Sequence, residues 1–145
     1  MEDQLLTNAL RRHALESNQI AFALSFREKI QLVLRTIRNV KSEADALNNG
    51  LYSSIKDWQE RNPKSYAQYE EFQANCIKVC YSLVPEDFRL FPAWMDKRPL
   101  VRLHQIFREF SPFTPMKLIE LNDTMEIESA ICDAVESIDA VFPKP

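Results

Sequence analysis

The stretch that decides the fold reads FREKIQLVLRTIRNVKSEADAL and spans residues 26–47. Its apolar residues recur at alternating intervals of four and three positions: Phe26, Ile30, Val33, Ile37, Val40, Ala44 and Leu47. This spacing places one narrow apolar edge along a single face of an α-helix, where partner helices can cover it. The stretch therefore predicts a long helix that packs against other helices.

Local signals suggest where this helix begins and ends. Ser25 and Glu28 match a capping box, so we expect the helix to begin there. Gly50 is the only glycine of the chain, and we predict that it ends the helix in the left-handed conformation. Upstream, the apolar spacing predicts a first helix over about residues 3–16. The apolar residues 20–24 either extend that helix or form a buried connection.

The same apolar spacing recurs in three later segments, over residues 69–83, 100–110 and 127–141. A short helix is expected over residues 51–61, with Leu51, Ile55 and Trp58 as its apolar positions. Three further helices are expected to start where a cap or a proline stands, at Asn62-Pro63, Pro99 and Thr114-Pro115. We predict an all-α protein, an antiparallel helical bundle of five to seven helices with short proline-containing connections. A single domain is expected to span residues 1–145.

The composition excludes several classes of function. A chain of 145 residues carries roughly ten glycines at average usage, whereas this one has a single glycine. Phosphate-binding loops, dinucleotide fingerprints and nucleophile elbows all need glycine. The N-terminus resembles no signal peptide, and no apolar run is long enough to cross a membrane. We therefore expect a soluble cytoplasmic protein with no cofactor, no small-molecule substrate and no membrane partner.

The cysteines and carboxylates predict no metal site. Cys76 and Cys80 lie one helical turn apart, but only Cys132, His13 and His104 remain as further Cys or His ligands, without paired spacing. No Glu-x-x-His pair of the kind used by di-metal bundles is present. We interpret the cysteines as small apolar core residues in a reducing compartment.

Charge is unevenly distributed along the chain. Residues 119–145 hold seven acidic side chains against one lysine. The last helix is therefore acidic on the faces that flank its apolar edge. Two interpretations remain open: a solvated surface, or a helix that docks on a basic surface of this chain or of another molecule.

Two sets of basic residues suggest a nucleic-acid interface as an alternative. One set lies beside the apolar edge of the long helix, and the other lies near residue 100; the candidates are Arg35, Arg38, Lys41, Arg98, Arg102 and Arg108. Glu28 and Asp45 interrupt the first set, and the sequence pI of about 5.5 is low for a dedicated nucleic-acid binder.

Arg98 and His104 are separated by five residues at the start of a predicted helix. This spacing resembles the Arg-x(4–6)-His signature of the helical nuclease domains called HEPN. The resemblance implies a ribonuclease in which the histidine assists attack by a ribose 2′-hydroxyl. On an ideal helix, however, the two side chains differ by about 120° around the axis and converge poorly.

Apolar residues also fill two connections, FRLFPAWM at 88–95 and the segment around Phe113. Such segments either plug the end of a bundle or face a partner. The candidate partner-binding residues are Leu90, Phe91, Trp94, Met95 and Phe113. Because no catalytic motif is present, we expect a small protein-interaction or regulatory module rather than an enzyme. It would act by binding a protein partner or by self-association, and the alternatives are a nucleic-acid-associated factor and a HEPN-like ribonuclease.

Overall fold

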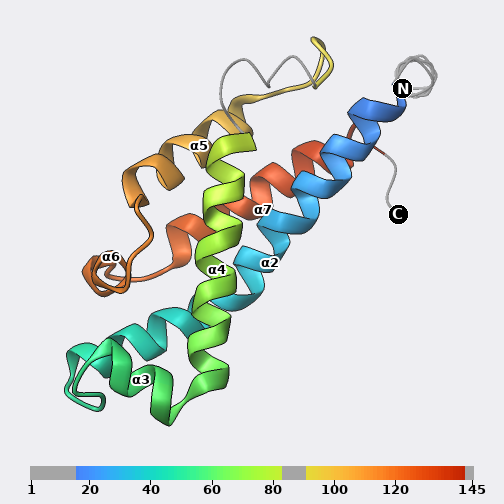
Figure 1. Cartoon of the computed structure of the whole chain (residues 1–145). Coiled ribbons are helices and arrows are strands. Elements are labelled where there is room, and N and C mark those ends of the chain that lie inside the picture. Colours follow the sequence, from blue (N-terminus) through green and yellow to red (C-terminus); the bar gives the residue numbers. More distant parts are fainter. Residues whose placement is uncertain (1–15, 83–90, 143–145) are drawn as a thin grey trace.

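The computed structural model describes residues 16–82 and 91–142, and this part of the chain contains helices and no strand. The helices are α2 (Ser17–Asn48), α3 (Ile55–Arg61), α4 (Pro63–Ser82), α5 (Arg98–Phe110), α6 (Pro115–Glu120) and α7 (Met125–Asp139). The predicted all-α class is confirmed. Figure 1 shows α2 as a long diagonal helix with α4 beside it, while α7 lies between α2 and α5. The chain reverses between α2 and α4 and again between α5 and α7, which is compatible with an antiparallel bundle.

The predicted start of the long helix is wrong. Helix α2 begins at Ser17, and Ser25 lies exposed inside it. The capping box is formed instead by Glu16 and Gln19, whose side-chain oxygen accepts a hydrogen bond from the Glu16 backbone N–H at 3.0 Å. Residues 20–24 continue the helix because its buried edge extends one step upstream, to Ala23. Apart from residue 16, the predicted first helix lies outside the described residues.

The other end of α2 agrees with the prediction. Gly50 has a φ of 84°, in the left-handed region that a side chain disfavours. Its backbone N–H donates to the Leu47 carbonyl at 3.2 Å, and the Leu51 N–H donates to the Ala46 carbonyl at 2.9 Å. These two bonds satisfy carbonyl groups that the end of a helix leaves without partners. The chain can therefore turn sharply away from α2.

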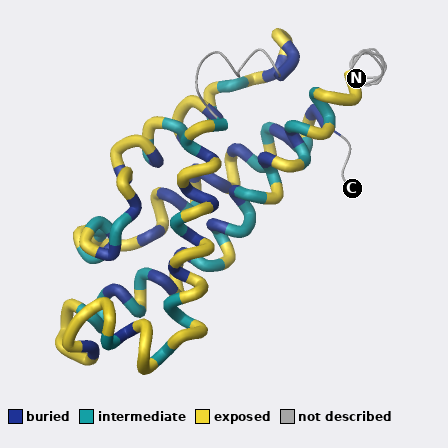
Figure 2. Tube along the Cα trace, in the orientation of Figure 1, coloured by how far each residue is buried: buried dark blue, intermediate teal, exposed yellow. Residues whose placement is uncertain are grey.

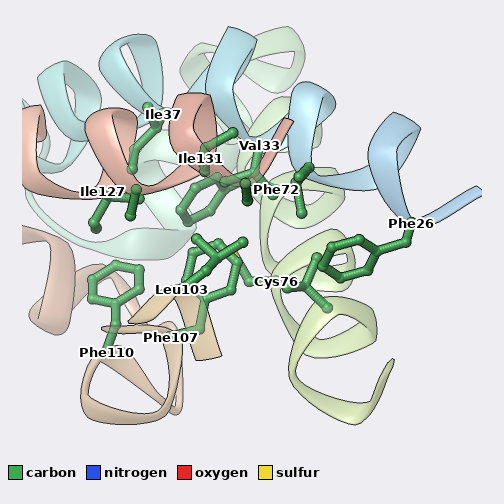
Figure 3. Close-up of a cluster of buried hydrophobic side chains, with 14 of the residues drawn as sticks. Phe26, Val33, Ile37, Phe72, Cys76, Leu103, Phe107, Phe110, Ile127 and Ile131 are labelled. Atoms are coloured by element: carbon green, nitrogen blue, oxygen red, sulfur yellow. The ribbon is translucent and has the colours of Figure 1, made fainter. Parts of the chain in front are cut away.

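The apolar edge of α2 forms the centre of the core. Its predicted residues from Phe26 to Ala44 are fully buried, and Leu47 is half-buried. Figure 2 shows buried positions recurring along the long helices, with exposed positions between them. In Figure 3, Phe72 and Cys76 of α4 lie near the α2 edge, and Leu103 of α5 lies in the same cluster. The core is completed by further buried residues of α5 and α7: Leu100, Phe107, Phe110, Ile127, Ile131, Ala134 and Ile138.

Two of the predicted caps are present. The Asn62 side chain accepts a hydrogen bond from the Ser65 N–H at 3.3 Å, at the start of α4. Thr114 accepts one from the Lys117 N–H at 3.4 Å, at the start of α6. Helix α5 begins at Arg98, so the predicted Pro99 lies in its first turn. Leu83, the last predicted apolar position of α4, lies outside the described residues. None of the described helices is long and apolar enough to cross a lipid bilayer.

The corner between α2 and α4 is built differently from the prediction. Trp58 of α3 is fully buried, as expected, but Leu51 and Ile55 are exposed. Tyr52 takes the inner position instead and stacks on Trp58, with ring centroids 6.2 Å apart. Apolar spacing alone did not distinguish Tyr52 from Leu51, because the residues before α3 are not helical.

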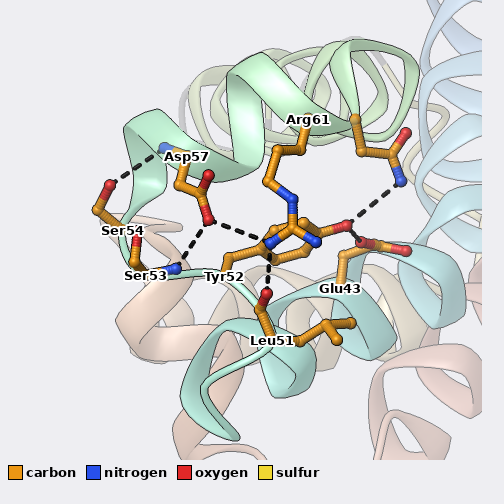
Figure 4. Close-up of polar contacts among 8 residues, drawn as sticks. Glu43, Leu51, Tyr52, Ser53, Ser54, Asp57 and Arg61 are labelled. Carbon is orange, nitrogen blue, oxygen red and sulfur yellow. Dashed lines mark hydrogen bonds and ion pairs between the residues drawn. The ribbon is translucent and has the colours of Figure 1, made fainter.

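Polar contacts hold this corner in place (Figure 4). The Tyr52 hydroxyl donates to Glu43 of α2 at 2.8 Å. Arg61 lies over the Tyr52 ring, 5.3 Å from its centroid, and donates to the Leu51 carbonyl at 2.6 Å. Asp57 accepts a hydrogen bond from Arg61 at 3.3 Å and another from the Ser53 N–H at 2.9 Å. The charged residues Glu43, Asp57 and Arg61 therefore stabilise this corner of the fold.

Candidate functional site

Two side chains in the described part of the aromatic connection before α5 face inward. Phe91 and Met95 are buried, and the Phe91 ring meets the rings of Phe22, Phe26 and Phe142 edge-on at 5.4–6.3 Å. Phe91 and Met95 were candidate partner-binding residues, and the structure corrects this expectation. Both side chains cover one end of the core and offer no free surface to a partner. Trp94 is 39% exposed. Leu90 lies outside the described residues.

Phe113 is also buried, so the expectation that it binds a partner is corrected too. Its ring lies 6.2 Å from that of Phe107 and 5.5 Å from that of Phe110. Its φ of 63° is costly for a bulky residue, by about 1–3 kcal/mol, and burial of the ring offsets this cost. The Tyr69 hydroxyl donates to the Phe113 carbonyl at 3.1 Å, and burial raises the pKa of Tyr69 to about 12.

Most of the candidate nucleic-acid-binding residues are paired with carboxylates. Arg38 contacts Glu128 at 2.7 Å, Lys41 contacts Asp45 at 2.5 Å, Arg98 contacts Asp96 at 2.9 Å and Arg102 contacts Asp133 at 3.2 Å. Arg35 and Arg108 are exposed. A cation that already has a carboxylate partner gains less from a phosphate, because the first partner must be displaced or must share the charge.

The acidic helix α7 docks on basic residues of its own chain. Asp139 pairs with Arg27 of α2 at 2.6 Å. Glu128 pairs with Arg38 of α2, and Asp133 pairs with Arg102 of α5. The second interpretation of the acidic helix is thus confirmed for these three carboxylates. Their partners lie on the two long neighbours of α7, so the charges help to place it between them.

Arg98 and His104 do not form a joint site. The Arg98 side chain is directed to Asp96, which accepts hydrogen bonds from Nε at 2.9 Å and Nη2 at 3.0 Å. His104 is half-buried, and its Nδ1 has no hydrogen-bond partner in the described part of the chain. Burial lowers the pKa of His104, and the positive charge of Arg108 lowers it further. The arginine that acts on His104 is therefore Arg108.

The cysteines differ from one another in exposure. Cys76 is buried and Cys80 is half-buried, as expected of core residues. Cys132 is exposed, so the prediction that it is a core residue is wrong. Burial raises the pKa of the Cys76 and Cys80 thiols, which makes both weak nucleophiles. Within residues 16–82 and 91–142, no group of three or more Cys, His, Asp or Glu side chains is placed to hold a metal ion.

A groove of about 260 Å³ opens where α5, α6 and the start of α7 meet, and we call it the acidic groove. Its floor is apolar and its rim is charged; the lining residues are Ile106, Glu109, Phe110, Lys117, Glu120, Leu121, Asp123, Glu126 and Ile127. Its volume is below the ~300–1,000 Å³ typical of small-molecule sites. The groove can receive a single protruding side chain of a larger partner.

Two exposed methionines stand next to groove residues in the sequence. Met116 precedes Lys117 and is 63% exposed, while Met125 precedes Glu126 and is 68% exposed. Methionine is flexible and polarisable, and it adapts to differently shaped partners. The sequence did not predict this site, because its residues come from three helices and a connection. The exposed methionines beside the acidic C-terminal region were the available signal.

No protein family, curated protein or solved structure matches this chain.

Proposed function

We propose that this chain is a protein-interaction or regulatory module that binds a protein partner or a second copy of itself. The observation that carries the proposal is a pair of large exposed apolar side chains, Met116 of α6 and Met125 at the start of α7, on helices that also line the acidic groove. Large apolar side chains contribute most to binding when a partner buries them in a well-packed interface.

The surroundings of the groove support a protein partner over the two alternatives. Glu109, Glu120, Asp123 and Glu126 repel phosphate, so this surface is unsuited to nucleic acid. The ribonuclease alternative needs Arg98 and His104 to act together, and Arg98 is engaged with Asp96.

The test measures association of the full chain. Light scattering after size exclusion reports self-association, and quantitative affinity capture from the native host reports partners. We expect a dimer or a stoichiometric partner that is lost in Met116→Ser/Met125→Ser. The matched control is Leu51→Ser/Ile55→Ser, which removes two exposed apolar side chains from the α2–α3 corner. A monomer that captures no partner at any concentration would contradict the proposal.

A further inference from the structure

The rim of the acidic groove brings together carboxylates that are distant in sequence. Glu109 comes from α5, Glu120 from the end of α6, Asp123 from the following connection and Glu126 from the first turn of α7. The lining contains one cation, Lys117, and its ammonium group lies 3.8 Å from Glu120. Four negative charges around one positive charge leave this surface strongly negative.

Two of these carboxylates are available to a partner. Asp123 accepts a hydrogen bond from the Met125 N–H at 2.8 Å, and Glu120 is paired with Lys117. Glu109 and Glu126 are both exposed, and neither forms an ion pair or side-chain hydrogen bond within the described residues. Each is free to accept a new cation without giving up a contact of the fold.

The floor between them is apolar. Phe110 and Ile127 are buried beneath it, while Ile106 and Leu121 are half-buried and keep part of their surface in contact with solvent. Covering that surface with an apolar side chain removes it from water, which is favourable in proportion to the area covered. The groove thus combines an apolar seat with negative charges around it.

We propose that the acidic groove binds a positively charged segment of a different protein, in which an apolar anchor residue is flanked by lysine or arginine. This inference rests on the proposed function and names the chemistry of the partner. The anchor fills the groove, and the flanking cations meet Glu109 and Glu126. Complementary charge of this kind speeds association and selects among partners.

The same charges argue against a second copy of this chain as the occupant. A two-fold dimer places the same patch of both copies face to face. Here that arrangement would oppose two acidic rims, and like charges at an interface are costly. The chain as a whole is also negative, with a formal net charge of −3. A cationic partner satisfies the rim, whereas a second copy does not.

The test uses the full chain as bait and a displayed library of random peptides as the probe. We expect selection of peptides that combine lysine or arginine with at least one large apolar residue. Binding of a selected peptide is then measured by fluorescence anisotropy. In Glu109→Gln/Glu126→Gln it should be about two- to thirtyfold weaker, because two surface charge pairs are lost. Added salt should weaken the wild-type complex more than the variant complex.

The matched control is Glu60→Gln/Glu71→Gln, which removes the same charge from exposed positions on α3 and α4. It should bind like the wild type, and thermal melting should show that both variants are folded. The inference is overturned if no peptide is selected, if the selected peptides are not cationic, or if the groove variant binds them unchanged. If association of the full chain still depends on Met116 and Met125, the proposed function survives that failure.

Discussion

Arg27 of α2 and Asp139 of α7, which are 112 positions apart in the sequence, form a bidentate ion pair. Nε donates to Oδ1 at 2.6 Å and Nη2 donates to Oδ2 at 3.1 Å. A second pair, Arg38 with Glu128, joins the same helices at 2.7 Å. From one pair to the next, both partners move eleven positions, about three helical turns, in opposite directions along the chain. Both pairs fit one register of α7 on α2.

The two pairs differ in burial, which predicts different contributions to stability. The Arg27 and Asp139 side chains are 17% and 21% exposed, and Arg27 also donates to Gln31 at 3.0 Å. Arg27→Gln should lower the free energy of unfolding by about 1–3 kcal/mol, because Asp139 is left part-buried without its partner. Arg38 is 75% exposed, and Glu128 still accepts a hydrogen bond from the Thr124 hydroxyl at 2.7 Å when Arg38 is lost, so Arg38→Gln should cost less than about 1 kcal/mol. Urea unfolding measures both, and equal losses would contradict this ranking.

The buried edge of α2 should not tolerate charge. Ile37 is fully buried at the centre of that edge. Ile37→Asp should lower the free energy of unfolding by about 3–5 kcal/mol, because an unpaired carboxylate is then held away from water. Thermal melting followed by circular dichroism measures the loss. Asn39→Asp adds the same charge at an exposed position of the same helix and should melt like the wild type. A near-normal melting temperature for Ile37→Asp would refute burial of the edge.

Removing the hydrogen bond that Tyr69 donates to the Phe113 carbonyl should lower the free energy of unfolding by about 1–3 kcal/mol. Tyr69→Phe removes the donor and leaves a buried carbonyl without its partner. Tyr81→Phe, at an exposed position of the same helix, is the control and should change stability by less than about 0.5 kcal/mol. If the two variants unfold at the same urea concentration, the bond contributes nothing.

Tyr69 also predicts a loss of stability in alkali. Its pKa is raised from 10.0 to about 12, so the folded chain keeps the phenol proton where the unfolded chain has lost it. The free energy of unfolding should therefore fall as the pH rises from 10.0 towards 12, and Tyr69→Phe should reduce this fall. Ultraviolet titration of phenolate formation in the folded chain, with urea unfolding across the same range, measures both effects. An ordinary titration midpoint for Tyr69 would contradict the expectation.

His104 should destabilise the fold in mild acid. Burial and Arg108 lower its pKa below the ordinary value of 6.5, so the unfolded chain takes up a proton first. This contribution to stability is complete above pH 6.5 and is lost as the pH falls towards the folded-state pKa. Nuclear magnetic resonance titration of His104 should give a midpoint below 6.5 that rises in Arg108→Gln. A midpoint at or above 6.5 in the wild type would show that His104 is well solvated.

The pairing of the basic residues predicts weak affinity for polyanions. Arg38, Lys41, Arg98 and Arg102 each have a carboxylate partner, so the full chain should pass through heparin at low salt. Retention that weakens steeply with added salt would instead support the nucleic-acid alternative. In that case, Arg35→Gln/Arg108→Gln should abolish retention, because these are the two candidates without a carboxylate partner in the described part of the chain.

The candidate site could be predicted only in part. The sequence located the aromatic connections and the acidic C-terminal region, but it left open whether the connections plug the core or face a partner, and the structure buries Phe91, Met95 and Phe113. Whether an apolar connection covers the core or faces solvent depends on the ends of neighbouring helices, and periodicity holds no information about them. The acidic groove escaped for a related reason, since Glu109 and Glu126 become neighbours only when α5 packs beside α7.

The sequence by itself determined the all-α class, the buried edge of α2 from Phe26 to Ala44, the left-handed end at Gly50 and the caps at Asn62 and Thr114. These features are local, because side chains a few positions apart on one helix share a face whatever surrounds them. Only the tertiary structure decided that α7 docks on Arg27 and Arg38, that Tyr52 replaces Leu51 beside Trp58, and that a groove opens between α5 and α7. Those outcomes depend on contacts between residues far apart in the chain, where packing and charge decide among arrangements that the local pattern permits equally.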